Sequence, residues 1–310
     1  MTEYKIILNP ISGHGAGRES IPGIHAAMQA ANLSYELVET LRPGHAIELA
    51  RQAAISGFDV IVSAGGDGTA NEVLNGLMLA RDDGVDAAMG VLGIGRGNDF
   101  AFGASIPAGL DDGVATLANN HRSRIDIGYV EGGYFPQGRY FGNGIGVGFD
   151  AVVGFEAMKM KRLRGFLSYL VAALKTIFLY YQAPRVLLEF EGGTMELDAL
   201  MVSIMNGRRM GGSFMMAPDS SNTDGMFDLC IAKQISKPGV LMLIPRFMAG
   251  SQGSHNAVLF TRAGELTVKA LRGSLPVHAD GETVCEEGTE LRIRILPSQL
   301  EVICLPEALA

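Results

Sequence analysis

The chain has 310 residues, a net charge of −8 and an ordinary globular composition, with 47% hydrophobic and 19% charged residues. This composition excludes a disordered or fibrous protein, and the length predicts one large domain or two of ordinary size. The excess of acidic residues argues against a general nucleic-acid-binding surface, so no nucleic-acid partner is expected. Three well-separated cysteines and the absence of a recognisable signal peptide predict a cytoplasmic protein without disulfides or a zinc site.

Glycine is over-represented, with 41 residues, nearly twice the usual share of about 7%. Glycine serves where the backbone takes positive φ or where a ligand approaches it closely, and both situations are typical of phosphate-binding loops.

The first part of the chain, to about residue 125, alternates between short apolar runs and helical stretches. This alternation predicts a doubly wound parallel α/β domain over residues 1–125, with its ligand site at the carboxyl ends of the strands. The expected strands are 4–9, 34–40, 58–64 and 87–92, and the expected helices are 21–31, 45–56, 70–80 and 109–119.

The second part, residues 126–310, consists mainly of short strand-like runs with turn signals between them. This pattern predicts a β-sandwich domain with helical insertions near 155–182 and 237–249, and the last residues could return to the first domain. The expected strands are 124–130, 140–147, 186–190, 197–205, 227–232, 257–261, 265–270 and 291–296.

Three glycine-containing loops are expected at one edge of the parallel sheet. The strongest signal is Gly65-Gly66-Asp67-Gly68-Thr69, which lies between a predicted strand and a helix that begins near Ala70. Backbone N–H groups and a helix N-terminus bind phosphate in such a loop, and Asp67 is interpreted as an N-cap or a partner of magnesium. The other loops are residues 9–17 and 92–100. One such loop alone is compatible with an ordinary turn, whereas three at one edge favour a nucleotide site.

The absence of other signatures narrows the kind of nucleotide chemistry. The sequence has no GxxxxGK[ST], no GxGxxG opening a helix, no HRD and DFG pair and no GxSxG. These absences argue against a Walker P-loop protein, a dinucleotide dehydrogenase, a protein kinase and an α/β-hydrolase.

Five ordered motifs resemble the soluble bacterial lipid kinases that have a diacylglycerol kinase catalytic domain. The GGDGT loop alone is shared with NAD kinases and relatives of phosphofructokinase, but the five motifs together span nearly the whole chain. They are Asn9-Pro10-x-Ser12-Gly13, Gly65-Gly66-Asp67-Gly68-Thr69 with Asn71-Glu72, Gly95-x-Gly97-Asn98-Asp99-Phe100-Ala101, Gly146-x-Gly148-Phe149-Asp150-Ala151 and Asn222-x-Asp224-Gly225.

The resemblance implies that ATP binds between the α/β domain and the β-sandwich domain, and that its γ-phosphate passes to a lipid hydroxyl. One position departs from the family, which usually has Thr where this chain has Arg96, a residue able to pair with phosphate directly. The residues implied to bind ATP are Asn9, Pro10, Ser12, Gly13, Thr40, Gly65, Gly66, Asp67, Gly68, Thr69, Asn71, Arg96 and Asn98.

The catalytic base is expected in Ala279-Asp280-Gly281-Glu282. In an extended segment the carboxylates of Asp280 and Glu282 share one face, and two neighbouring carboxylates raise one pKa, which suits a base. Seen alone, the same residues are compatible with a turn carrying two solvated acids. The resemblance implies Glu282 as the proton acceptor and Asp280 as its essential partner, although either carboxylate is open to the role of base.

A magnesium site is implied by the resemblance within residues 218–226. Asp224 would bind the cation through its carboxylate, and the main-chain carbonyls of Ser221 and Met226 would complete an oxygen ligand set. The alternative is a polar turn before a strand, which needs no metal.

A lipid-facing side is suggested by residues 156–185, which contain six basic residues and one acid, Glu156, interleaved with apolar residues. This pattern predicts a basic amphipathic helix on an anionic membrane, although a helix packed on the sandwich explains the apolar stripe equally well. Residues 238–250 are expected to flank the same acceptor groove. The basic residues are Lys159, Lys161, Arg162, Arg164, Lys175 and Arg185.

The sequence therefore predicts an ATP- and Mg²⁺-dependent lipid kinase whose acceptor, most simply diacylglycerol, lies at the inner membrane surface. Two alternatives remain open: phosphorylation of a soluble acceptor, as in an NAD kinase, and a non-catalytic nucleotide-binding relative. A homodimer is also left open.

Overall fold

The computed structural model describes residues 2–95, 97–159, 171–172, 174–177 and 183–306, without the side chains of residues 157 and 158. The chain divides into two compact units: residues 1–127 with 297–310, and residues 128–296. It leaves the first unit within β5 (Arg122–Gly132) and returns within β15 (Glu290–Ile303).

The first unit is built on a parallel sheet in the order β15-β4-β3-β1-β2. Its inner strands β3 and β4 are almost fully buried because helices cover both faces of the sheet, as expected for a parallel sheet, whereas the edge strand β2 is mixed in polarity. This confirms the predicted parallel α/β region. The remaining strands are β1 (Glu3–Leu8), β2 (Ser34–Glu39), β3 (Val60–Gly65) and β4 (Ala88–Gly93).

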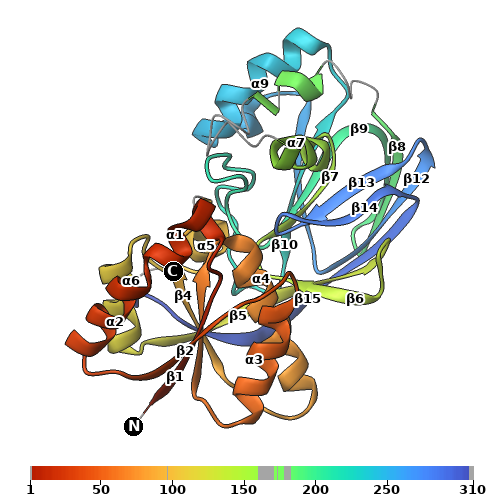
Figure 1. Cartoon of the computed structure of the whole chain (residues 1–310). Helices are drawn as coiled ribbons and strands as arrows, with labels where there is room; N and C mark the ends of the chain where they lie inside the picture. The colour runs from red at the N-terminus through yellow and green to blue at the C-terminus, as the bar shows by residue number, and fades with distance from the viewer. Residues whose placement is uncertain (1, 96, 160–170, 173, 178–182, 307–310) are drawn as a thin grey trace. The chain divides into compact units, whose positions relative to one another are not determined.

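Figure 1 shows α2 (Ile21–Ala30) and α6 (Leu110–Asn119) on one side of these strands, and α3 (His45–Ile55) and α4 (Asp67–Asp82) on the other. Alternate side chains of each strand point to opposite faces, so Ile6 and Leu8 pack with α2 and α6 in one core cluster. Short helical segments that the sequence did not predict occupy the loops after β1 and β4. They are η1 (Ser12–Gly15), α1 (Ala16–Glu19) and α5 (Asp99–Gly103).

The second unit contains two antiparallel sheets that share one long strand. One sheet has the order β14-β13-β7-β9-β10-β11, and the other joins β8, β12, β15, β5 and β6. Strand β9 (Gly193–Met205) pairs with β8 through residues 193–198 and with β7 through residues 201–205. The other strands are β6 (Phe135–Phe141), β7 (Gly144–Gly148), β8 (Arg185–Phe190), β10 (Phe227–Lys233), β11 (Val258–Ala263), β12 (Glu265–Arg272), β13 (Leu275–Ala279) and β14 (Glu282–Gly288).

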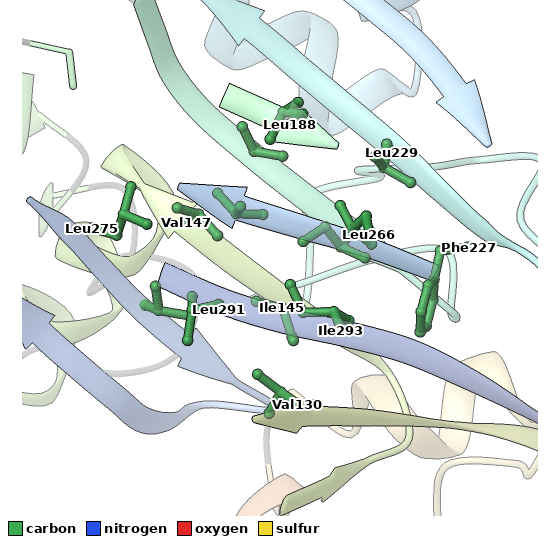
Figure 2. Close-up of a cluster of buried hydrophobic side chains, with 14 of the residues drawn as sticks. Val130, Ile145, Val147, Leu188, Phe227, Leu229, Leu266, Leu275, Leu291 and Ile293 are labelled. Atoms are coloured by element: carbon green, nitrogen blue, oxygen red, sulfur yellow. The ribbon is translucent and has the colours of Figure 1, made fainter. Parts of the chain in front are cut away.

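A large hydrophobic core joins strands of the second unit (Figure 2). It contains Ile145 and Val147 of β7, Leu266 of β12, and the stacked rings of Phe141 and Phe227, whose centroids are 5.6 Å apart. The antiparallel, β-rich character predicted for this part of the chain is therefore confirmed.

A second cluster lies on the opposite face of β9, where α7 (Phe149–Lys159) and α9 (Lys237–Ala249) pack. Helix α9 begins after Ser236, whose Oγ accepts a hydrogen bond from the Gly239 N–H at 3.4 Å, and ends at Gly250 in the left-handed conformation. The 3-10 turn η2 (Gln252–Ser254) follows.

Two element predictions were wrong, and one hairpin was missed. The helix after Gly66 begins at Asp67 rather than near Ala70, because Gly66 is already the N-cap residue. The predicted strand 140–147 is two strands, β6 and β7, which break at residues 142–143. The hairpin β13–β14 was not predicted. Among the described residues, no helix has the length and apolar character needed to cross a membrane.

Candidate functional site

The candidate site residues of the first unit lie around the loop between β3 and α4. Gly65 is tightly enclosed, since a Cβ atom there would lie 2.5 Å from Thr69 Oγ1. Gly66 is extended and has no side chain with which to cap α4, so the first N–H groups of a 16-residue helix point to the carboxyl edge of the sheet without a side-chain cap. Such a helix start carries partial positive charge and binds anions such as phosphate.

Asn9 connects the β1 loop to this helix start. Its Nδ2 donates to Thr69 Oγ1 at 3.1 Å, and its main-chain N–H donates to Ala64 O at 3.0 Å. Ser12 Oγ donates back to Asn9 O at 2.9 Å. Pro10 follows Asn9 and is buried, while Gly13 takes a φ of +58° that favours glycine.

The β4 loop contacts the same glycines. The N–H groups of Ile94 and Gly95 donate to Gly65 O at 2.9 and 3.2 Å, and a Cβ atom on Gly95 would lie 2.5 Å from Gly66 Cα. Asn98 is left-handed, with a φ of +49°, and its Nδ2 donates to Gly95 O at 3.1 Å. The three loops therefore meet at one sheet edge, as their positions after parallel strands predicted.

Asp67 has a different role from the predicted N-cap. It is the first residue of α4, and its Oδ1 accepts a hydrogen bond from the Phe100 N–H at 3.1 Å, which ties the helix start to α5. The N-cap interpretation was wrong because the extended Gly66 occupies that position. Gly68 follows in the first turn of the helix.

The remaining predicted ATP residues of the first unit differ in position. The N–H of Thr40 donates to Leu8 O at 2.8 Å, so Thr40 lies directly beyond the end of β2. Asn71 is buried inside α4 and its Oδ1 accepts from Asn75 Nδ2 at 3.2 Å. Arg96 lies outside the described residues.

Glu72, which appeared in the sequence only as part of a motif, has a structural role. Its carboxylate accepts hydrogen bonds from the N–H groups of Gly44 and Ala46 at 2.8 and 3.0 Å. These donors belong to the start of α3, so Glu72 caps a neighbouring helix from α4.

The candidate site residues of the second unit lie around the turn between β13 and β14. Asp280 and Gly281 have φ values of +48° and +85°, as the two-residue type I′ hairpin turn requires. The expectation of an extended segment with both carboxylates on one face was therefore wrong. Asp-Gly between two apolar runs is itself a hairpin signal that could have identified the turn.

Asp280 holds the loop between β6 and β7. Its Oδ2 accepts a hydrogen bond from the Gly142 N–H at 2.7 Å, and its Oδ1 accepts from the N–H groups of Asn143 and Gly144 at 2.9 and 3.0 Å. The Asp280 N–H donates to Gly144 O at 3.0 Å. The carboxylate therefore fixes the turn, and Glu282 follows it as the first residue of β14.

The same loop is bound to residues 206–220. Asn143 O accepts from the N–H groups of Asn206 and Gly207 at 2.9 and 2.8 Å, and Asn206 Nδ2 donates to Gly142 O at 2.8 Å. Ser220 Oγ donates to Asn206 O at 3.3 Å. Sequence reasoning missed this network, since isolated asparagines carry no spacing signal.

A buried polar group lies on the α7 side of β13. Ser203 Oγ donates to Asp150 Oδ2 at 2.8 Å, and His278 Nε2 is 3.8 Å from Asp150 Oδ1. Because Ser203 binds the carboxylate rather than the imidazole, these three residues are not arranged as a nucleophilic triad. Burial, followed by the charge of Asp150, raises the pKa of the neighbouring Cys230 to about 12.

In the segment predicted to bind magnesium, residues 218–226, Asp224 forms an ion pair with an arginine of the same chain. Asp224 Oδ2 is paired with the Arg262 guanidinium, and Asp224 Oδ1 accepts from the Met226 N–H at 3.1 Å. Both carboxylate oxygens therefore interact with groups of the chain, and the magnesium role implied for Asp224, Ser221 and Met226 stays a prediction. Among the residues that the structure describes, no group of three or more His, Cys, Asp or Glu could hold a metal ion.

The predicted basic helix is only partly described. Lys161, Arg162 and Arg164 lie outside the described residues. Lys159 and Lys175 both bind Glu156, and these hydrogen bonds hold the pKa of Glu156 below its ordinary value. Arg185 pairs with Glu196 and Asp198 on β9.

Two family models match the chain. Residues 3–130 match the diacylglycerol kinase catalytic domain, and residues 143–304 match the YegS C-terminal NAD kinase beta sandwich-like domain. The chain is 28% identical over 284 residues to a diacylglycerol kinase of Bacillus subtilis, covering 91% of this chain and 90% of that protein. It is 27% identical over 301 residues to a diacylglycerol kinase of Mycobacterium tuberculosis, covering 96% and 93%.

Solved structures show the same fold. A diacylglycerol kinase from Bacillus anthracis superposes with a TM-score of 0.75 at 21% identity, covering 100% of this chain and 98% of that chain. An NAD kinase from Archaeoglobus fulgidus in complex with ATP superposes with a TM-score of 0.55 at 15% identity, covering 100% and 96%. At these identities the likeness establishes architecture alone.

Proposed function

Because the chain belongs to the family of bacterial diacylglycerol kinases and YegS-like lipid kinases, within the NAD kinase superfamily, we propose that it is an ATP- and Mg²⁺-dependent lipid kinase. Its acceptor is the hydroxyl group of a membrane lipid, most simply diacylglycerol. The observation that carries the proposal is the convergence of three loops on the start of α4, where the helix N-terminus offers its N–H groups to phosphate.

In this proposal the first unit binds the nucleotide. The start of α4 and the loops after β1 and β4 receive the phosphates, with Asn9 fixing Thr69 in place. Thr40 and the loop residues Ser12, Gly13 and Asn98 complete the nucleotide contacts. Magnesium, when bound with the nucleotide, neutralises charge on the β- and γ-phosphates.

The second unit supplies the base. Glu282 takes the proton from the lipid hydroxyl while the hydroxyl oxygen forms a bond to the γ-phosphorus of ATP. The bond between that phosphorus and the β,γ-bridging oxygen breaks, and ADP leaves. Asp280 is a positioning residue, since its carboxylate already binds three main-chain N–H groups.

The test is phosphorylation by the purified protein with Mg²⁺ and radiolabelled ATP. Mixed micelles of diacylglycerol, monoacylglycerol or a sphingoid base are the lipid acceptors, and NAD is the soluble acceptor. We expect a labelled lipid, identified by mass, and no labelled NAD. Label in NAD alone, or in none of these acceptors, would contradict the proposal.

Glu282→Gln tests the assignment of the base. The variant retains the size of the side chain but cannot take up the proton, so turnover should be abolished while ATP affinity is unchanged. Retained turnover in this variant would exclude Glu282 as the base.

A further inference from the structure

Helix α9 is apolar on both of its faces. Val240, Leu243 and Phe247 are buried in the cluster against β9 and β10. On the other side, Met242 is 71% exposed, and Leu241 and Met248 are each 40% exposed. A surface helix ordinarily presents polar residues to water, so this second apolar face requires an explanation.

The exposed residues form one continuous stripe. At 100° per residue, positions 238, 241, 242, 245, 248 and 249 fall within an arc of about 120°. These positions are occupied by Pro, Leu, Met, Pro, Met and Ala. Lys237 and Arg246 border the stripe on its two sides, and α9 contains no acidic residue.

The charges select the kind of partner. The chain as a whole carries a net charge of −8, yet both charged residues of α9 are cations at the margins of its apolar stripe. An apolar face bordered by cations is complementary to an anionic phospholipid surface, where apolar side chains enter the headgroup region and cations meet phosphates. Pairing with the same face of a second copy would bring cations toward cations, which disfavours that occupant.

We propose that α9 is an interfacial membrane-binding helix that lies in the plane of an anionic phospholipid bilayer, with Leu241, Met242 and Met248 inserted among the headgroups. The proposal deepens the proposed function, since a lipid acceptor has to be reached at a membrane, but the binding itself requires no catalysis. Lys237 and Arg246 stabilise the bound state electrostatically.

The test is co-sedimentation of the full chain with vesicles of phosphatidylglycerol and phosphatidylcholine. We expect the wild-type protein to bind these vesicles, and to bind pure phosphatidylcholine vesicles or vesicles in 1 M salt several-fold more weakly. Met242→Glu should lower the partition coefficient at least tenfold. Lys237→Gln and Arg246→Gln should each lower it about fivefold.

Leu271→Glu is the matched control, because Leu271 is an exposed apolar residue of β12, at 49% exposure, outside α9. It adds the same charge and should leave vesicle binding unchanged. Met248→Glu serves as a second insertion variant, and thermal unfolding confirms that each variant is folded. Equal binding by Met242→Glu and the wild type, or equal losses in Met242→Glu and Leu271→Glu, would overturn the proposal.

A second readout separates this proposal from the proposed function. Phosphorylation of a water-soluble, short-chain diacylglycerol needs no membrane, so Lys237→Gln, which lies outside the expected acceptor groove, should retain that activity and lose part of its activity on vesicles. If the wild-type protein phosphorylates the soluble acceptor but does not bind vesicles, the membrane-binding role of α9 is refuted and the proposed kinase activity is not. Vesicle binding without any phosphorylation would refute the kinase alone. A dimer in gel filtration that Met242→Glu dissociates, together with no vesicle binding, would assign the face to a second copy and overturn the proposal.

Discussion

Replacement of Asp280 separates positioning from chemistry at the β13–β14 turn. The Asp280 carboxylate accepts three main-chain hydrogen bonds at 2.7, 2.9 and 3.0 Å, two of them at Oδ1. In Asp280→Asn the Oδ1 atom can keep its two bonds, while the amide NH₂ replaces the oxygen that faces the Gly142 N–H. In Asp280→Ala all three bonds are lost.

The magnitudes follow from these contacts. A hydrogen bond to a charged group contributes about 1.5–3 kcal/mol, and the lower end applies because the turn is half-buried and water can replace lost partners. We expect Asp280→Asn to lower the free energy of unfolding by about 1–2 kcal/mol. Asp280→Ala loses all three bonds and also places alanine at a left-handed φ of +48°, which costs about 1 kcal/mol, so it should lower the free energy of unfolding by about 5–6 kcal/mol.

Urea unfolding measures the stability, and lipid phosphorylation measures kcat and KM. If Asp280 acts by positioning, Asp280→Asn should retain part of kcat, Asp280→Ala should retain much less, and KM for ATP should change little in both. Glu282→Gln should show the opposite pattern, with no turnover and little loss of stability. The reasoning would be refuted if Asp280→Asn were as inactive as Glu282→Gln while its unfolding free energy equalled that of the wild type.

Three further changes test separate features of the fold. Glu72→Gln removes the charge that caps α3 and should lower the free energy of unfolding by about 1–2 kcal/mol in urea; an unchanged midpoint would contradict the capping role. Gly65→Ala places a Cβ atom 2.5 Å from Thr69 Oγ1 and should destabilise the protein by about 1–3 kcal/mol. The control is Gly66→Ala, whose Cβ atom would lie 3.4 Å from Gly95 Cα, and this variant should unfold near the wild-type midpoint. Burial raises the pKa of Cys230 from 9.0 to about 12, so the folded state favours the thiol and its stability should fall as pH rises from 9 toward 12, by up to about 4 kcal/mol. Cys230→Ala should flatten this alkaline loss, and an identical pH dependence in both proteins would exclude the cysteine as its cause.

Much of the first unit could be predicted because its signals are local. The apolar run before Gly65 fills a buried parallel strand, and the glycines that follow it allow the tight turn into α4. The position of Asn9 beside Thr69 follows from parallel strands ending at one edge. The start of α4 was placed three residues late because a glycine N-cap carries no side-chain signal.

The second unit was harder to predict because the contacts of its predicted site residues join distant segments. Asp280 binds residues 142–144 across more than 130 positions of sequence, and no local pattern reports such a pairing. Arg262 lies in an ordinary strand pattern, so its pairing with Asp224 could be found only in three dimensions. The roles assigned to the ATP residues and to Glu282 stay predictions until ligand binding and turnover are measured.

The return of β15 to the first unit has a consequence for biosynthesis. Val302, near the end of β15, pairs with Met89 of β4, so the order β15-β4-β3-β1-β2 is completed only by residues that follow the whole second unit in the chain. Until the ribosome has released them, β4 is an open strand edge that can pair with other nascent chains. The first unit therefore cannot finish folding as an independent amino-terminal domain, and a fragment ending before residue 297 would expose this edge permanently.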